Sequence, residues 1–176
     1  MKKRTTIGLF SLVGMLALLL GGCSSSSGDG TTTTPIEKYY FKASNTGTND
    51  EFGFSVALSD DGSTMAVGAR FEAGNNTGGE SDNSIAQAGA VYIFVATAGT
   101  WQQEEYLKAP AVIDPDGDQF GFSVALSSDG NTLAVGAPYD DQGGDDAGAV
   151  YIFTRSAGIW TQQQKVTASN ATAGYL

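Results

Sequence analysis

Residues 50–69 read DEFGFSVALSDDGSTMAVGA, and residues 118–137 read DQFGFSVALSSDGNTLAVGA. Sixteen of these twenty aligned positions are identical, and the heptapeptide AGAVYIF also occurs twice, at 88–94 and at 147–153. Motifs that recur in a fixed order indicate an architecture built from repeated structural units. The first motif recurs after 68 residues and the heptapeptide after 59, so we infer a unit of about 60 residues with nine extra residues in its first copy.

We place the first complete unit at about 44–109 and the second at about 110–168. Parts of further units flank them. Tyr39–Ala43 resembles the last strand of a preceding unit, and Lys165–Ser169 matches the end of the first unit, which indicates the start of a third. The predicted folded region is therefore 37–176.

Each unit is predicted to contain four short strands. Tight-turn sequences separate the first two, because Gly62 and Gly130 can adopt the positive φ that such hairpins require. No 3.6-residue apolar period occurs after the N-terminal segment, so the sequence predicts an all-β fold. The expected strands lie near 53–58, 63–69, 89–96, 100–108, 121–126, 131–137, 148–154 and 159–167.

Side chains alternate between large and small along these strands. Phe54, Val56 and Leu58 are expected on one face of the first strand, with Ser55 and Ala57 on the other. A sheet with one face in water would instead alternate apolar with charged residues. Large and small faces suit sheets that stack on one another, as the four-stranded blades of a β-propeller do.

The repeated motifs resemble the FG-GAP repeat, which is the blade unit of integrin α-chain propellers and of many bacterial surface proteins. The matching residues are Phe52-Gly53 with Gly68-Ala69-Arg70, and Phe120-Gly121 with Gly136-Ala137-Pro138. The first unit departs from the motif because Arg70 stands where proline is expected. The resemblance covers roughly residues 39 to 170 and implies a β-propeller.

Two complete units do not make a ring, because propellers of this family close with about seven blades. We therefore expect an incomplete propeller. Two alternatives follow: the chain is a fragment or truncated product of a longer propeller, which we favour, or its units assemble between chains. An isolated pair of blades would expose surfaces that were shaped for neighbours.

The N-terminal segment has the features of an export signal. Positive residues precede an apolar run at Ile7–Leu20, which is shorter than the roughly 20 residues that a membrane-spanning helix needs. The run ends in Leu20-Gly21-Gly22-Cys23, which resembles the lipobox of bacterial lipoproteins. The resemblance implies a signal peptide at 1–22 and a lipid-modified Cys23. The alternative is an ordinary signal peptide beside a chance cysteine.

Residues 23–36 are rich in Ser, Thr and Gly, so we expect a flexible tether between lipid and fold. Loss of the signal removes three basic residues and changes the formal charge from −10 to −13. Such an acidic chain is a poor nucleic-acid binder. We expect the lipid on Cys23 to hold the protein in the bacterial cell envelope, and Ser24 permits delivery to the outer membrane.

Catalysis has little support in the sequence. There is no histidine, so the commonest general base and metal ligand is absent. Gly53–Ala57 faintly imitates a nucleophile elbow, but its Ser55 recurs as Ser123 in a strand, and we interpret both as packing residues. The repeated Trp101 and Trp160 are interpreted as packing residues too. We therefore expect no enzyme, no catalytic residues and no cofactor.

Calcium sites of this family lie in an Asp-x-Asp-x-Asp loop of the first hairpin, but the hairpins here are too short to supply six to eight oxygens. Two acidic clusters remain open as candidates, although we favour solvated turns for both and predict no metal. One is Asp114, Asp116 and Asp118; the other is the loop Asp140–Asp146.

The leading functional hypothesis is a lipid-anchored, non-enzymatic interaction module with an unknown protein or glycan ligand. The motivation is the combination of anchor, tether and integrin-like blades. One alternative is the N-terminal fragment of a longer envelope enzyme whose catalytic residues lie elsewhere. Another is a truncated product without function, which would be prone to aggregate.

Overall fold

The computed structural model describes residues 40–75, 77–110 and 117–169. These residues all lie in the second of two compact parts of the chain, Tyr40–Leu176. The predicted signal peptide, Cys23 and the predicted tether fall outside the described residues. Among the residues that are described, no helix is both long and apolar enough to cross a membrane.

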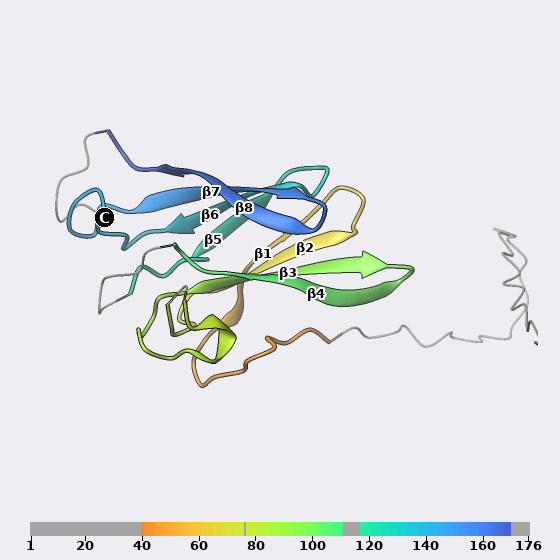
Figure 1. Cartoon of the computed structure of the whole chain (residues 1–176), viewed down its shortest axis with the longest axis horizontal. Coiled ribbons are helices and arrows are strands. Elements are labelled where there is room, and N and C mark those ends of the chain that lie inside the picture. Colours follow the sequence, from red (N-terminus) through yellow and green to blue (C-terminus); the bar gives the residue numbers. More distant parts are fainter. Residues whose placement is uncertain (1–39, 76, 111–116, 170–176) are drawn as a thin grey trace, which may run out of the picture. The chain divides into compact units, whose positions relative to one another are not determined.

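Two four-stranded antiparallel sheets make up the fold, and the strands of each sheet lie in sequence order (Figure 1). Sheet 1 contains β1 (Phe52–Leu58), β2 (Thr64–Ala69), β3 (Ala90–Thr97) and β4 (Thr100–Leu107). Sheet 2 contains β5 (Ser123–Leu126), β6 (Thr132–Ala137), β7 (Ala149–Ser156) and β8 (Ile159–Val166). The described residues include one 3₁₀ turn, η1 (Gly79–Ser81), and no α-helix. The predicted all-β architecture of four-stranded units is confirmed, and neither sheet closes on itself.

A tight turn joins the first two strands of each sheet, as predicted. Gly62 and Gly130 both have φ of 68°, in the left-handed region that favours glycine. Beside Gly62, the Asp61 carboxylate accepts hydrogen bonds from the Ser59 hydroxyl (2.6 Å) and the Ser63 backbone N–H (2.9 Å). These bonds favour the charged form and lower the pKa of Asp61 to about 2.

A bulge in β1 changes which phenylalanine enters the core. The pairing of β1 with β2 is interrupted between Phe52 and Ser55, where three steps along β1 match one along β2. Phe52 and its counterpart Phe120 pack into the cores of the two repeats, and Phe120 is fully buried. Phe54, which we expected on a face packed against a neighbour, is 42% exposed and lies against Phe122, with ring centroids 5.1 Å apart.

Each sheet has a bulky face and a small face, as the alternation predicts. Residues paired directly across antiparallel strands share a face. On sheet 1, Val67 pairs with Tyr92 on the bulky face, whereas Gly68 pairs with Val91 on the small face. The same two classes of side chain alternate along β6 and β7 of sheet 2.

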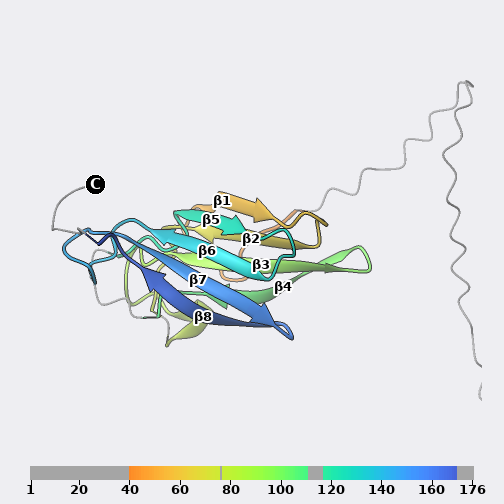
Figure 2. The ribbon, with the colours of Figure 1, turned by 90° about the horizontal axis from the view of Figure 1, so that it is seen from above.

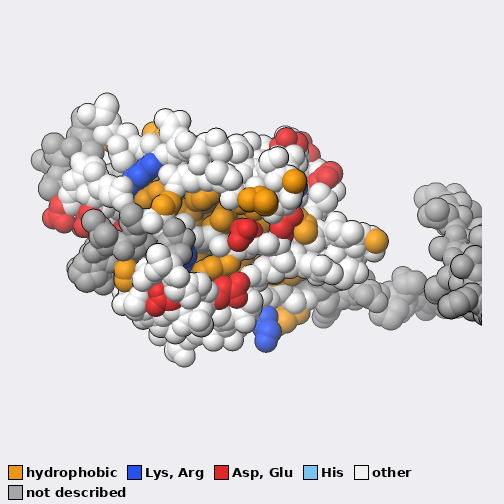
Figure 3. All heavy atoms as spheres, viewed as in Figure 1, with side chains coloured by type: hydrophobic (Ala, Val, Ile, Leu, Met, Phe, Trp, Pro, Cys, Tyr) orange, Lys and Arg blue, Asp and Glu red, His pale blue; other side chains and the backbone are white. Residues whose placement is uncertain are grey.

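The bulky face of sheet 2 packs on the small face of sheet 1, and we call this interface the seam. Figure 2 shows β1 and β5 side by side, and both β1 and β2 contact β5. Hydrophobic side chains gather along the seam in the space-filling view (Figure 3). The predicted packing of large on small side chains is therefore confirmed. The core of the seam includes Phe120, Leu133, Val135, Tyr151, Phe153 and Trp160 from the second repeat, and Ala66, Val91, Ile93 and Leu107 from sheet 1.

Polar contacts also cross the seam. The Ser55 hydroxyl donates a hydrogen bond to the backbone carbonyl of Gly121 at 2.8 Å, so this serine is a packing residue, as expected. Near the outer strands, the Glu104 carboxylate accepts hydrogen bonds from the Arg155 guanidinium (3.0 Å) and the Trp160 indole N–H (3.1 Å). These contacts fix the register of one sheet on the other.

The segment before β1, Tyr40–Asn45, crosses the bulky face of sheet 1 without strand structure. Phe41 packs edge-on against Phe94 and Trp101, with ring centroids 5.5 and 5.6 Å apart, and Ala43 is buried. We expected Tyr39–Ala43 to be the last strand of a preceding unit, and Tyr39 lies outside the described residues. Its described part instead lies as irregular chain over the face that such a unit would cover.

Candidate functional site: a polar hollow beside sheet 1

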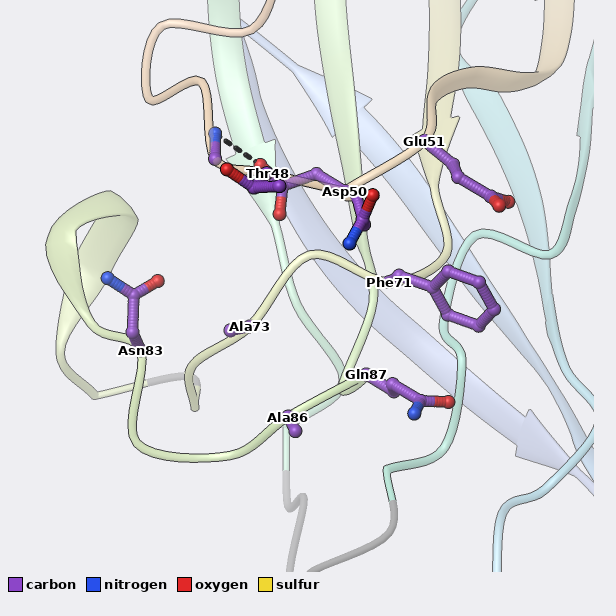
Figure 4. A pocket seen from close by; sticks show the side chains of 10 residues that line it. Thr48, Asp50, Glu51, Phe71, Ala73, Asn83, Ala86 and Gln87 are labelled. Atoms are coloured by element: carbon purple, nitrogen blue, oxygen red, sulfur yellow. Dashed lines mark hydrogen bonds between the residues drawn. The ribbon is translucent and has the colours of Figure 1, made fainter.

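Loops at one end of sheet 1 enclose two adjoining hollows, which we call the rim hollow. The larger part has a volume of about 660 Å³ and lies between residues 47–51 and the β2–β3 connection. The smaller part, about 240 Å³, shares Gly47, Asp50 and Asn83 with it. In Figure 4, Thr48 and Asp50 lie on one side of the larger part, opposite Ala86, with Asn83 on a separate turn of chain.

The lining of the rim hollow is rich in oxygen atoms. Carboxylates accept hydrogen bonds only, whereas side-chain amides both donate and accept. Together they complement amine and hydroxyl groups. The polar lining comprises the carboxylates of Asp50, Glu51, Glu72 and Glu80 and the amides of Asn45, Asn49, Asn83 and Gln87.

A buried acid lies at the base of the smaller part. Glu72 is only 1% exposed, and its Oε1 accepts a hydrogen bond of 2.6 Å from the Asn45 amide. The same amide donates to the backbone carbonyl of Glu80 at 2.5 Å. The Tyr92 hydroxyl lies 2.6 Å from Asn45 Oδ1 and 3.1 Å from Glu72 Oε2. These hydrogen bonds connect the Tyr40–Asn45 segment to the β2–β3 connection.

Lys108 forms hydrogen bonds with the β2–β3 connection. Its ammonium group is buried and donates to the backbone carbonyls of Glu72 (3.0 Å) and Ala73 (2.6 Å). Burial lowers the pKa of Lys108 to about 8, although the neighbouring Glu72 carboxylate acts in the opposite direction. The lysine therefore stabilises the wall of the hollow by hydrogen bonds to backbone carbonyls.

Burial favours the neutral forms of Glu72 and of the two tyrosines near it. It raises the pKa of Glu72, and the charge of Asp50 adds to this effect. Burial likewise raises the pKa values of Tyr92 and Tyr106, and the Glu72 charge reinforces both shifts. Both tyrosines are therefore neutral donors at physiological pH.

The second repeat has a buried acid at the equivalent position, with different partners. Asp140 is fully buried and accepts a hydrogen bond from the Tyr151 hydroxyl. Lys165 forms an ion pair of 2.5 Å with it. Lys165 pairs with Tyr151 across β7 and β8, the place that Tyr106 has beside the equivalent tyrosine in sheet 1. The tyrosine contact of the acid is thus kept in both repeats, and a salt bridge replaces the asparagine contact of the first repeat.

Left-handed backbone conformations in the lining do not mark a ligand site. Non-glycine residues seldom adopt positive φ, and such strain often gathers at functional sites. Here, however, the conformation recurs in both repeats, so it belongs to the shared fold. The lining residues are Asn49, Glu51 and Gln87, with φ of 70°, 55° and 54°, and their counterparts are Gly117, Gln119 and Asp146, with φ of 82°, 52° and 51°.

Arg70, which departs from the repeat motif, contacts two residues that line the larger part of the hollow. Its guanidinium lies over the rings of Phe54 and Phe71, 3.9 and 4.3 Å from the centroids, in cation–π geometry. It also forms an ion pair of 2.7 Å with Glu51, which lines the hollow. Proline at this position could make neither contact.

The first predicted acidic cluster is only partly described. Asp114 and Asp116 lie outside the described residues. Asp118 is buried, with 3% exposure, so the expectation of a solvated turn is wrong for this residue. In the described ranges, no group of three or more acidic, histidine or cysteine side chains has an arrangement that could hold a metal ion.

The second predicted acidic cluster divides into one buried residue, Asp140, and a partly exposed remainder. We expected the whole Asp140–Asp146 loop to be solvated, but Asp140 is buried by its contacts with Lys165 and Tyr151. Farther along the loop, Asp141 Oδ1 accepts a hydrogen bond of 2.7 Å from the backbone N–H of residue 146. Asp140 therefore has a structural role.

Comparison with known protein families matches two segments, residues 39–94 and 101–153, to the FG-GAP repeat. The chain belongs to the FG-GAP repeat family. Both FG-GAP motifs lie inside the matched segments, and their phenylalanines, Phe52 and Phe120, pack into the cores of the two repeats. No curated protein matched the chain.

Three residues that line or support the rim hollow were not predicted from the FG-GAP sequence. Glu72 could have been predicted as a structurally important acid, because an acidic residue stands three residues after the Gly-Ala pair in both repeats, as Glu72 and as Asp140. Lys108 follows an apolar strand residue, which hinted at a buried polar role. Asn45 had no signal, because its contacts with Glu72 depend on how the N-terminal segment crosses the sheet.

Proposed function

We propose that this FG-GAP protein is a lipid-anchored, non-enzymatic interaction module of the bacterial cell envelope. The observation that carries the proposal is the rim hollow, about 660 Å³ in its larger part, formed by loops on a rigid sheet. Loops held by a scaffold are the usual place for binding residues, and concave sites of this size take small ligands or parts of larger ones. The ligand is a protein or a glycan that presents hydroxyl or amine groups.

Two observations support a binding role rather than catalysis. The chain has no histidine, and the buried groups beside the hollow already bond to one another. The acidic lining also repels phosphate, which argues against a nucleic-acid partner.

Anchoring rests on the sequence at Cys23. A lipid on this residue would connect the module to the membrane through residues 23–36, and two or three acyl chains give a stable anchor. The test is the fractionation of cells that express the wild type, Cys23→Ala or Ser24→Ala. We expect Cys23→Ala to move to the soluble fraction and Ser24→Ala to remain in the outer-membrane fraction. Retention of Cys23→Ala in the membrane pellet would contradict lipid anchoring.

Ligand binding can be tested at Asn83, which is exposed and lines both parts of the hollow. Soluble peptidoglycan fragments and a lysine-rich peptide serve as glycan and protein probes, with binding measured by calorimetry. We expect one probe to bind saturably and Asn83→Ala to weaken it roughly tenfold, as loss of hydrogen bonds in a site does. Gln142→Ala, in the corresponding loop of the second repeat, is the control. Equal effects of the two variants, or no binding of either probe, would contradict the assigned site.

A further inference from the structure

The small face of sheet 2 is open to solvent, although the equivalent face of sheet 1 is buried. Val150 and Val166 are 41% and 44% exposed. Their counterparts in sheet 1, Val91 and Leu107, lie in the core of the seam. Along the paired positions of β5–β8 this face carries no ionisable side chain, whereas sheets that face water normally present charged residues.

On the other side of the two stacked sheets, part of the bulky face of sheet 1 is exposed. Val56 and Leu58, on the bulky face of sheet 1, are 57% and 54% exposed. Their counterparts in β5, Val124 and Leu126, pack against the core of the seam. The open small face of sheet 2 and the exposed β1 side of the bulky face of sheet 1 are thus the same two kinds of surface that already pack together at the seam.

We propose that the small face of sheet 2 binds the bulky face of sheet 1 of a second copy of this chain, head to tail. The seam is the template for this interface, because it joins the same two faces with largely the same residues. Head-to-tail contacts build rings when the rotation closes. Propellers have four to eight blades, so a ring of two-sheet chains would contain about two to four copies. The proposal rests on the fold and does not require a ligand in the rim hollow.

Most contacts of the seam transfer to the new interface. Ser123 replaces Ser55, and its hydroxyl would donate to the backbone carbonyl of Gly53 in the second copy, as Ser55 does to Gly121. Two contacts do not transfer. Arg70 lies over the Phe122 ring of the second repeat, 5.6 Å from its centroid, but its counterpart is Pro138. Gln163 replaces Glu104, and Ala96 stands where Arg155 would be needed, so the ion pair of the seam has no equivalent.

The Tyr40–Asn45 segment competes with the second copy. Phe41 covers Phe94 and Trp101 on the bulky face of sheet 1. At the seam the corresponding tryptophan, Trp160, is instead contacted by Glu104 of sheet 1. An incoming β8 would place Gln163, the counterpart of Glu104, at Trp101 and must displace Phe41. Displacement of a packed segment subtracts from the affinity, so the expected association is in the micromolar range.

The first test is the sedimentation velocity of the full 176-residue chain in mild detergent, from about 1 to 200 μM, the range in which micromolar association is visible. We expect the mass to rise with concentration to a species of two to four copies. Val150→Lys places an unpaired charge in the interface and should weaken association at least tenfold. Gln142→Lys adds the same charge in an exposed loop and should leave association unchanged.

The second test strengthens the interface. Ala96→Arg combined with Gln163→Glu installs between two copies the ion pair that Arg155 and Glu104 form at the seam. We expect the double variant to tighten association roughly tenfold, because close interfacial charge pairs couple this strongly. Neither single variant should do so. This test does not depend on whether Val150→Lys folds.

A chain that sediments as a monomer at every concentration, both as wild type and as the double variant, would overturn the proposal. Association that neither Val150→Lys nor the double variant alters would also overturn it, because the copies would then meet through another surface or through the lipid. Far-UV circular dichroism of each variant confirms that the sheets are intact.

Discussion

The two sheets have related sequences but differ in burial at equivalent positions. In the identical heptapeptides, Val91 is fully buried in sheet 1, whereas Val150 in sheet 2 is 41% exposed. In the first strands the order is reversed, because Val56 is exposed and Val124 is partly buried. The burial of a side chain therefore depends on which neighbour its face has, and the repeat sequence encodes both faces for contact.

The buried acids show a second difference between the repeats. Glu72 bonds to an asparagine and a tyrosine from other parts of the first repeat, whereas Asp140 bonds to a tyrosine and an ammonium group. Glu72 supports the wall of the rim hollow, and Asp140 stabilises a compact loop. The same backbone template thus accommodates a loop that lines the rim hollow in one repeat and a compact loop in the other.

The largest expected difference between the repeats concerns one isoleucine in the identical heptapeptides. Ile93 is fully buried in the seam, and Ile152 is its half-buried counterpart on the open face. Ile93→Ala should lower the free energy of unfolding by about 3–4 kcal/mol, because it creates a cavity. Ile152→Ala should cost about 1 kcal/mol, since its face lacks a packed neighbour. Urea denaturation measures both, and equal costs would show that the two faces have the same environment.

A smaller difference is expected at the buried acids. Asp140→Asn removes the charge that faces Lys165, and an unpaired ammonium beside a buried site should cost about 2–3 kcal/mol of unfolding free energy. Glu72→Gln keeps an acceptor for Asn45 and should cost about 1 kcal/mol. Thermal and urea unfolding of both variants would test this, and a larger loss at Glu72 would contradict the assignment of partners.

The smallest effect is a pH dependence specific to the first repeat. Lys108 has a pKa of about 8 in the folded protein, below its usual 10.5, so the unfolded chain binds more protons between these values. The free energy of unfolding therefore rises with pH between about 8 and 10.5. The stabilisation that comes from deprotonating Lys108 is absent below pH 8 and complete above 10.5. From pH 8 to about 9.5, before tyrosines ionise, the free energy of unfolding should increase by about 1.5 kcal/mol.

Lys108→Met serves as the control, because the variant has no ammonium group at this site. Urea titrations at several pH values should show a rising free energy of unfolding for the wild type and a flat profile for the variant. A fall in wild-type stability over the same range would contradict the burial of the charged lysine.

Strand order and sheet stacking could be predicted from the sequence because they follow from local patterns that occur twice. The bulge at Gly53 could not, since alternation with a period of two assigns Phe52 and Phe54 to the same face. The rim hollow was also missed, because Glu72 and Asn45 are 27 residues apart and meet only through the folded loop. The lipid at Cys23 remains a prediction outside the described residues.

The central claim, that the small face of sheet 1 is covered by sheet 2, is tested most directly at two equivalent glycines. A Cβ on Gly68 would lie 2.1 Å from the backbone carbonyl oxygen of Gly121 across the seam. A Cβ on Gly136 would approach only the Ser123 side chain of its own sheet closely. We predict that Gly68→Ala lowers the free energy of unfolding by about 2–3 kcal/mol more than Gly136→Ala, because the backbone at the seam must move. Equal free energies of unfolding for the two variants would contradict the stacking of the sheets.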